Sequence, residues 1–108
     1  MTTSASSDFE QFIAEWDTLL AQKYNQSYAE QAYGRMVKIT EEVGELANAL
    51  SCTLGHQRQS KVSSLNKDEL ANEIADIIIT VHLLAKMMDI NVPAALASKI
   101  AKIRSRLS

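Results

Sequence analysis

Two short acidic segments carry the residues of this sequence that are best suited to do chemistry. Glu42 and Glu45 lie three positions apart, and so do Glu73 and Asp76. Residues three apart on a helix are neighbours on one face, so each pair would set two carboxylates side by side. Carboxylate oxygens are ligands that Mg²⁺ prefers, and Mg²⁺ also bridges to phosphate oxygens. The two pairs therefore predict a magnesium site that acts on a phosphorylated substrate.

Both pairs fall within long helical patterns. Apolar residues recur at helical spacing from about Tyr28 to Cys52, and again from about Asn66 to Met88. Glu42 stands inside the apolar stripe of the first pattern, and Glu73 stands inside that of the second. We therefore expect these carboxylates to point toward the interior of a helical bundle or toward its edge.

Carboxylates placed there need a partner of opposite charge. Burying several of them together is unfavourable by many kcal/mol, or forces some of them to take up protons. A hard divalent cation would remove this penalty. Two other interpretations stay open: an acidic helix face in water with salt bridges, and a di-iron bundle. The latter uses Glu-x-x-His pairs, whereas here the second pair ends in Asp76, with His82 six residues beyond.

One further helix is expected before these two in the sequence, and one after them. Ser7 and Glu10 have the spacing of a capping box, so a first helix should begin near Asp8. A break is expected near Asn25. Pro93 suits the first turn of a last helix.

The small number of helix-breaking residues in the chain favours long helices. Its 108 residues include only three glycines and one proline. Residues 53–66 form a polar stretch, which predicts a loop between the two acidic helices. We expect an all-α fold, a single four-helix bundle-like domain over residues 8–108. Residues 1–7 are expected to be disordered.

Composition excludes several classes of function. The net charge is -2, so no basic excess is available to bind nucleic acid. No apolar run reaches the roughly 18 residues of a membrane span. The first seven residues lack the basic and apolar regions of a signal peptide. Cys52 is the single cysteine and has no internal disulfide partner, which makes a cytoplasmic location the default.

The acidic segments resemble those of one enzyme family. The sequence EVGELA at residues 42–47, followed by EIAD at residues 73–76, is similar to the MazG-like nucleotide pyrophosphohydrolases, near the dCTP-pyrophosphatase type. The family signature is Glu-Glu-x-x-Glu, a variable connection, and Glu-x-x-Asp, and the resemblance covers about residues 31–106. It implies an all-α oligomeric fold, dependence on Mg²⁺, and cleavage of a nucleoside triphosphate between its α- and β-phosphates.

The resemblance also implies roles for individual acids. Glu42, Glu45, Glu73 and Asp76 match the metal ligands of the family. Glu41 matches the leading acid of the motif, which would orient the attacking water or help to hold a second ion. A carboxylate near or on the metal is the candidate base, and Glu41 and Glu45 are the two that qualify.

Further matches concern the substrate. Members of the dCTP-pyrophosphatase type carry a Lys and then an Asn-Arg-x-Arg run, which Lys99, Arg104 and Arg106 match, while Ile103 replaces the Asn. The resemblance implies contacts from these cations to the triphosphate, and the simpler interpretation is that they complement a helix dipole. For Trp16, on an apolar stripe, core packing is favoured, and a place in the base pocket is the alternative by resemblance.

The expected function is Mg²⁺-dependent hydrolysis of a (deoxy)nucleoside triphosphate in housecleaning of the nucleotide pool, and the resemblance implies a dCTP-like substrate. The expected state is a cytoplasmic homodimer or homotetramer with no nucleic-acid or membrane partner. The interface candidates are Tyr28, Tyr33, Leu83 and Met87. Two alternatives remain: a phosphoribosyl-ATP pyrophosphohydrolase, and a non-catalytic helical interaction or dimerisation module.

Overall fold

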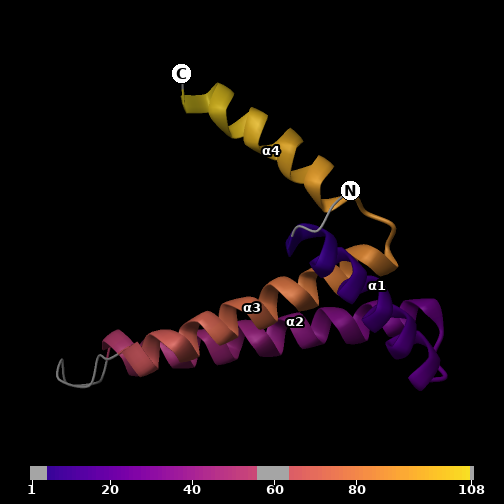
Figure 1. Ribbon diagram of the computed structural model, residues 1–108, viewed down its shortest axis with the longest axis horizontal. Helices are drawn as coiled ribbons and strands as arrows, with labels where there is room; N and C mark the ends of the chain where they lie inside the picture. Colours follow the sequence, from indigo (N-terminus) through magenta and orange to yellow (C-terminus); the bar gives the residue numbers. More distant parts are fainter. Residues whose placement is uncertain (1–4, 56–63, 108) are drawn as a thin grey trace. The chain divides into compact units, whose positions relative to one another are not determined.

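The described part of the chain, residues 5–55 and 64–107 of the computed structural model, is helical throughout apart from short connections (Figure 1). No strand occurs among these residues, and the expected all-α class is confirmed. The elements in chain order are α1 (Ala5–Lys23), α2 (Tyr28–Leu50), the π-helical turn η1 (Ser51–Gly55), α3 (Ser64–Met87) and α4 (Val92–Leu107).

The chain divides into two compact units. One unit is Gln26–Val81, which holds α2, η1 and most of α3. The other consists of Met1–Asn25 and His82–Ser108, which hold α1, the end of α3 and α4.

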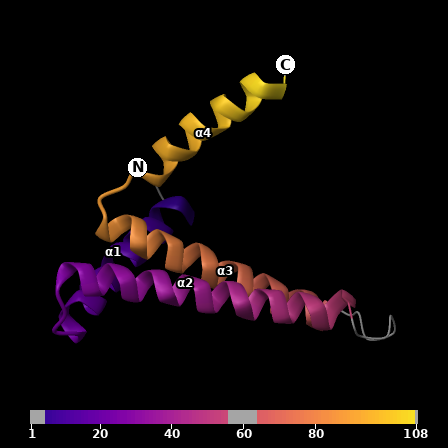
Figure 2. The same ribbon diagram turned by 180° about the vertical axis from the view of Figure 1, so that it is seen from behind.

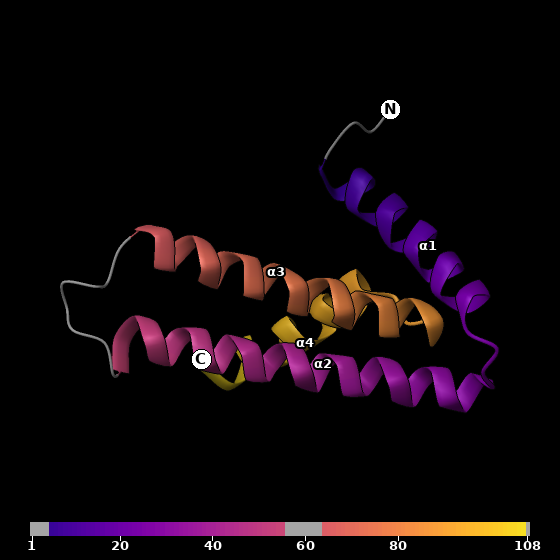
Figure 3. The same cartoon turned by 90° about the horizontal axis from the view of Figure 1, so that it is seen from below.

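The first unit is a helical hairpin in which α2 and α3 lie side by side and antiparallel (Figures 1 and 3). The buried residues of α2 are Arg35, Glu42 and Ala49, which are spaced by seven and so lie on one face. The same face is continued in η1 by Thr53, whose hydroxyl donates to the carbonyl oxygen of Ala49 at 2.9 Å. This face of α2 is the one that meets α3.

A second stripe on each helix of the hairpin is apolar and exposed. On α2 it consists of Met36, Val43 and Leu50, and on α3 it includes Ile74 and Val81. In both helices these residues are seven apart, which keeps them on one face. Each helix therefore has more apolar surface than the seam between the two helices can cover.

The position of this stripe follows from helix geometry. Successive residues are turned by about 100°, so Val43 lies to one side of the buried Glu42 and Glu41 lies to the other. The same reasoning places Ile74 beside Glu73 on α3. In an antiparallel pair, the residues that follow the seam positions come to the same face, so the two apolar stripes share one face of the hairpin. The acidic residues Glu41 and Glu45 border the opposite face.

A capping box begins α2. The Ser27 hydroxyl accepts from the Glu30 backbone N–H at 3.1 Å, and the Glu30 carboxylate accepts from the Ser27 backbone N–H at 2.8 Å. This reciprocal pair satisfies two backbone donors that a helix start leaves without partners. It fixes where α2 begins, and hence which of its residues face α3.

The second unit packs α1 against the end of α3 (Figure 2). Ile13 and Leu83 are each 5% exposed, and the rings of Phe9 and His82 meet edge to face at 4.8 Å. The ring contact joins residues that are distant in the sequence, and it holds α1 on the end of α3.

The connection from α3 to α4 is a tight turn. Asp89 has a left-handed φ of 58°, and the Ile90 N–H donates to the Ala85 carbonyl at 2.9 Å, as in a Schellman motif. The Asn91 side chain then accepts from the Ala94 N–H at 3.0 Å and so caps α4. Pro93 lies in the first turn of α4, as predicted.

Several expected boundaries were wrong. Helix α1 begins at Ala5, so the proposed capping pair of Ser7 and Glu10 lies inside the helix and the disorder expected for residues 5–7 is not observed. Helix α3 begins at Ser64, two residues before the expected start near Asn66. The loop expected from Thr53 begins instead with the π-helical residues of η1. Residues 1–4 and 56–63 lie outside the described residues.

The four interface candidates differ in their exposure to solvent. Tyr28 and Tyr33 are exposed, Met87 is half-buried, and Leu83 is buried within the chain, which excludes it from a subunit interface. Within the described ranges, no single helix is long and apolar enough to cross a membrane; α3 and α4 meet the criterion only when they are taken together as a bent pair.

We predict that the exposed apolar face of the hairpin makes this chain a homo-oligomer. Sedimentation velocity at micromolar concentration should give a dimer or a tetramer. Met36→Glu, which places a charge on this face, should shift the distribution toward monomer, because a charge within an apolar interface is unfavourable. Asn48→Glu adds the same charge on the other flank of α2 and should not. A wild-type chain that sediments as a monomer would contradict the prediction.

Candidate functional site

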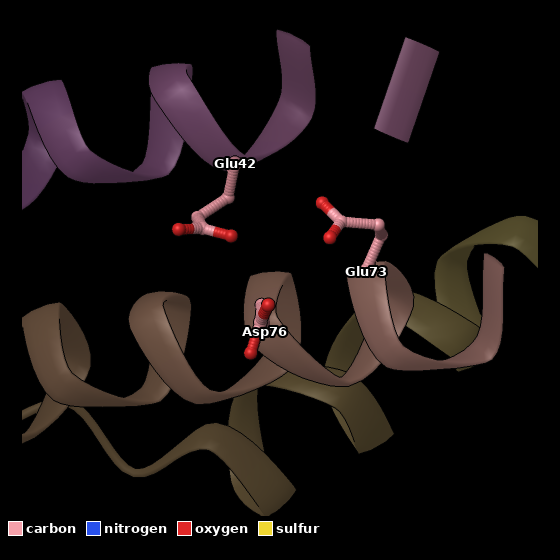
Figure 4. A group of neighbouring side chains, drawn as sticks. All are labelled: Glu42, Glu73 and Asp76. Carbon is pink, nitrogen blue, oxygen red and sulfur yellow. The ribbon is translucent and has the colours of Figure 1, made fainter. Parts of the chain in front are cut away.

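Three carboxylates meet across the seam of the hairpin. Glu42 comes from α2, and Glu73 and Asp76 come from α3, one turn apart. One oxygen from each lies within 4.8 Å of the others. Figure 4 shows the three side chains directed toward a common space between the two helices. We call these residues the acidic trio.

The trio contains acidic oxygens that lack hydrogen-bond partners. Glu42 is only 6% exposed, and its Oε2 and the Oε2 of Glu73 are buried without a partner among the described residues. Buried polar atoms in folded proteins are nearly always hydrogen-bonded, because an unpaired one loses its hydration without compensation. Three oxygen donors on two rigid helices fit a hard divalent cation, which would satisfy these oxygens.

Lys38 lies at one edge of the trio. Its Nζ is 3.3 Å from Oε1 of Glu42 and 3.7 Å from Oε1 of Glu41. The hydrogen bond with Glu42 and the negative charge of Glu42 raise the pKa of Lys38 above its ordinary value, against an opposing effect of desolvation. Lys38 therefore remains a cation beside the buried carboxylate.

Glu73 is electrostatically perturbed. Desolvation raises the pKa of Glu73 above its ordinary value, and the negative charges of Glu45, Asp76 and Glu42 raise it further. Without a bound cation, these negative charges lie close together and repel one another. The shift has the direction expected where carboxylates are crowded together and cation charge is insufficient.

An open groove of about 720 Å³ adjoins the trio. Both helices of the hairpin line it, with Glu73 common to the groove and to the trio. Its lining residues are Glu41, Gly44, Glu45 and Asn48 of α2 and Glu69 and Glu73 of α3. The groove gives a ligand access to the carboxylates from solution.

Comparison with known families identifies the family of this chain. Residues 31–108 match the MazG nucleotide pyrophosphohydrolase domain. The chain belongs to the MazG family. The match covers all of α3 and α4 and α2 from Gln31 on, including the acidic trio and the groove. No curated protein and no solved structure shows a significant match to the chain.

Membership in the MazG family supports nucleotide pyrophosphohydrolase activity in general, and enzymes of this family are generally metal-dependent. Of the predicted ligands, Glu42, Glu73 and Asp76 come together in the structure. Glu45 is not in the trio, but it lines the groove and its charge acts on Glu73. Glu41 lines the groove and pairs with Lys38. Their individual roles stay predictions.

Other groove residues were missed by the sequence interpretation. Gly44, Asn48 and Glu69 line the groove. Asn48 follows Glu45 by three positions, and Glu69 precedes Glu73 by four, so helical spacing alone could have extended the acidic face to both. Lys38 lies four residues before Glu42, so the same spacing places it beside the acidic face.

The predicted substrate contacts lie in the other compact unit. Lys99, Arg104 and Arg106 are exposed on α4. Trp16, on α1, is 42% exposed and stacks on Phe12 with ring centroids 6.2 Å apart, so the favoured core position for this residue was wrong. Contact of these four residues with the substrate stays a prediction.

The raised pKa of Glu73 predicts how stability depends on pH. The folded metal-free chain keeps a proton on Glu73 at pH values where the unfolded chain has lost it. Through this group, the free energy of unfolding falls as pH rises from the ordinary pKa of a glutamate to the raised folded value. Glu73→Gln removes the effect, so in chelator its stability relative to wild type should increase with pH across this window.

Thermal melting of wild type and Glu73→Gln at two pH values, with chelator and with Mg²⁺, measures this difference in stability. At neutral pH in chelator, Glu73→Gln should be at least as stable as wild type, and Mg²⁺ should stabilise it less, since the ion binds the ionised site. Glu69→Gln, one turn earlier on α3, is the matched control. A Glu73→Gln protein that melts well below wild type in chelator would make Glu73 a structural partner of a cation.

Proposed function

We propose that this chain hydrolyses a nucleoside triphosphate to the monophosphate and pyrophosphate, with Mg²⁺ bound by Glu42, Glu45, Glu73 and Asp76. The observation that carries the proposal is the Glu42 carboxylate: its Oε2 is buried without a partner in the described part of the chain, and one of its oxygens lies within 4.8 Å of an oxygen of Glu73 and of Asp76. An oxygen in this position is explained by a cation that binds with the substrate.

The chemistry requires charge neutralisation, an aligned water and a base. Bound Mg²⁺ would offset the negative charge of the phosphates and of the developing transition state. Glu41 and Glu45 line the groove beside the trio, where either carboxylate can hold a water and accept its proton. The remaining predicted contacts are Lys99, Arg104 and Arg106 of α4, which would bind the triphosphate, and Trp16, which would contact the base. No covalent intermediate is needed.

Substrate preference is proposed from resemblance. A dCTP-like deoxyribonucleoside triphosphate is the first candidate, with housecleaning of the nucleotide pool in the cytoplasm as the role. We propose a homodimer or homotetramer, without a nucleic-acid or membrane partner, as the active form.

Product analysis tests the reaction directly. A panel of nucleoside triphosphates, with phosphoribosyl-ATP included, should release the monophosphate and intact pyrophosphate in the presence of Mg²⁺. Chromatography that shows a nucleoside diphosphate and orthophosphate would mean that a different bond is cleaved. No release from any member of the panel would favour a non-catalytic helical module.

Two substitutions test the residues. Glu73→Gln and Asp76→Asn should each lower turnover by orders of magnitude, because the metal loses a charged ligand. Asp68→Asn, an exposed acid of α3 that is not in the trio, is the control and should retain activity. Rates close to wild type in both trio variants would refute the site.

Gly44 tests whether the substrate occupies the groove. A Cβ added at Gly44 or at Gly34 would meet nothing within 4 Å, and both glycines are inside α2. Each Gly→Ala change should therefore stabilise the helix by roughly 0.5–1 kcal/mol. Only Gly44 lines the groove, so Gly44→Ala should raise KM while Gly34→Ala should not. Thermal melting and steady-state kinetics of the pair measure this, and equal KM values would place the substrate elsewhere.

A further inference from the structure

The acidic trio already has a cation from its own chain. We propose that Lys38 is the built-in counter-cation of the metal centre: a positioning residue that holds Glu42 and offsets part of the carboxylate repulsion while no metal is bound. This inference rests on the proposed metal site but not on the reaction that the site performs.

The two oxygens of the Glu42 carboxylate have different surroundings. Oε1 faces Lys38 Nζ at 3.3 Å, whereas Oε2 has no partner among the described residues. The same ammonium is 3.7 Å from Glu41 Oε1 and so bridges two consecutive acids. Lys38 thus contacts one oxygen of a carboxylate that is directed toward the space between α2 and α3, where the carboxylates of Glu73 and Asp76 also lie (Figure 4).

The pair differs from an ordinary surface salt bridge. The Lys38 side chain is 56% exposed, but that of Glu42 is 8% exposed. Exposed pairs contribute little, because water solvates both charges well without the contact. Here the carboxylate has lost most of its water, so removal of its partner would leave a buried charge uncompensated. The contact therefore has a large effect on one partner while the other remains in solvent.

Two consequences follow for the metal-free protein. The carboxylates stay packed together in the fold, ready for an ion, because one positive charge already offsets part of their repulsion. The ion relieves less repulsion than it would without Lys38, so the stabilisation that it brings is smaller. Lys38 thus helps to keep the hairpin folded when the ion dissociates.

Thermal melting in chelator and in Mg²⁺ tests the proposal in the full-length chain. Lys38→Met should lower the melting temperature in chelator and enlarge the rise that Mg²⁺ produces. Lys38→Arg keeps the charge and should restore both values toward wild type. Lys67→Met, an exposed lysine of the same hairpin, should leave both unchanged. If Lys38→Met does not fold, Lys38→Gln, which keeps a polar side chain, replaces it.

A double-mutant cycle with Glu42→Gln separates this role from general helix stability. In the Glu42→Gln background, Lys38→Met should have little effect on melting in chelator, because the buried charge is already gone. An equal effect in both backgrounds overturns the proposal. So does an unchanged melting temperature of Lys38→Met in chelator, or a smaller response to Mg²⁺.

The assay for pyrophosphate release is independent of these measurements. If the melting pattern holds and no nucleotide is hydrolysed, the proposed function fails and the role of Lys38 stands. If wild type shows no response to Mg²⁺ by melting, the metal site fails, and the role of Lys38 fails with it.

Discussion

The hairpin depends on one unfavourable placement: a carboxylate, Glu42, buried in the seam between two helices. An apolar residue there would pack without any need for charge compensation. The chain instead aligns Glu42 with Glu73 and Asp76, so that helix packing and carboxylate repulsion oppose each other at the same positions. The fold tolerates this because Lys38 compensates one oxygen of Glu42. The other oxygen is left for an ion from solution.

Helix geometry then assigns different tasks to the two faces of the hairpin. The residue that follows Glu42 is apolar and exposed, and the residue that precedes it lines the groove. With about 3.6 residues per turn, these neighbours lie on opposite flanks of the seam. A partner that covered Met36, Val43 and Leu50 would leave the groove open to substrate. Association and chemistry can therefore use the same two helices without competing for surface.

The sequence predicted the helices because apolar periodicity depends only on spacing along the chain. The three-residue spacing of acids indicated four carboxylates, of which Glu42, Glu73 and Asp76 meet across the seam. Helix ends were less predictable, since Ser7 with Glu10 and Ser27 with Glu30 have the same spacing, yet only Ser27 stands at the start of a helix. The groove depends on which turns of α2 and α3 lie opposite each other, and that register is a property of the packed pair.

Two residues of α2 at the proposed site conflict with local rules for a helix. Glu42 is a charge on the buried face, and Gly44 is a glycine in a helix interior, where alanine would be more stable by roughly 0.5–1 kcal/mol. A similar pair lies away from the proposed site, where the glycine Gly34 and the buried Arg35 are neighbours in the interior of α2. The rest of α2 has a complete capping box at its start and apolar residues at seven-residue spacing. What distinguishes Glu42 and Gly44 is that they lie within one turn of each other, beside the carboxylate oxygens that lack partners, and a loss of stability at such a cluster points to selection for something other than stability.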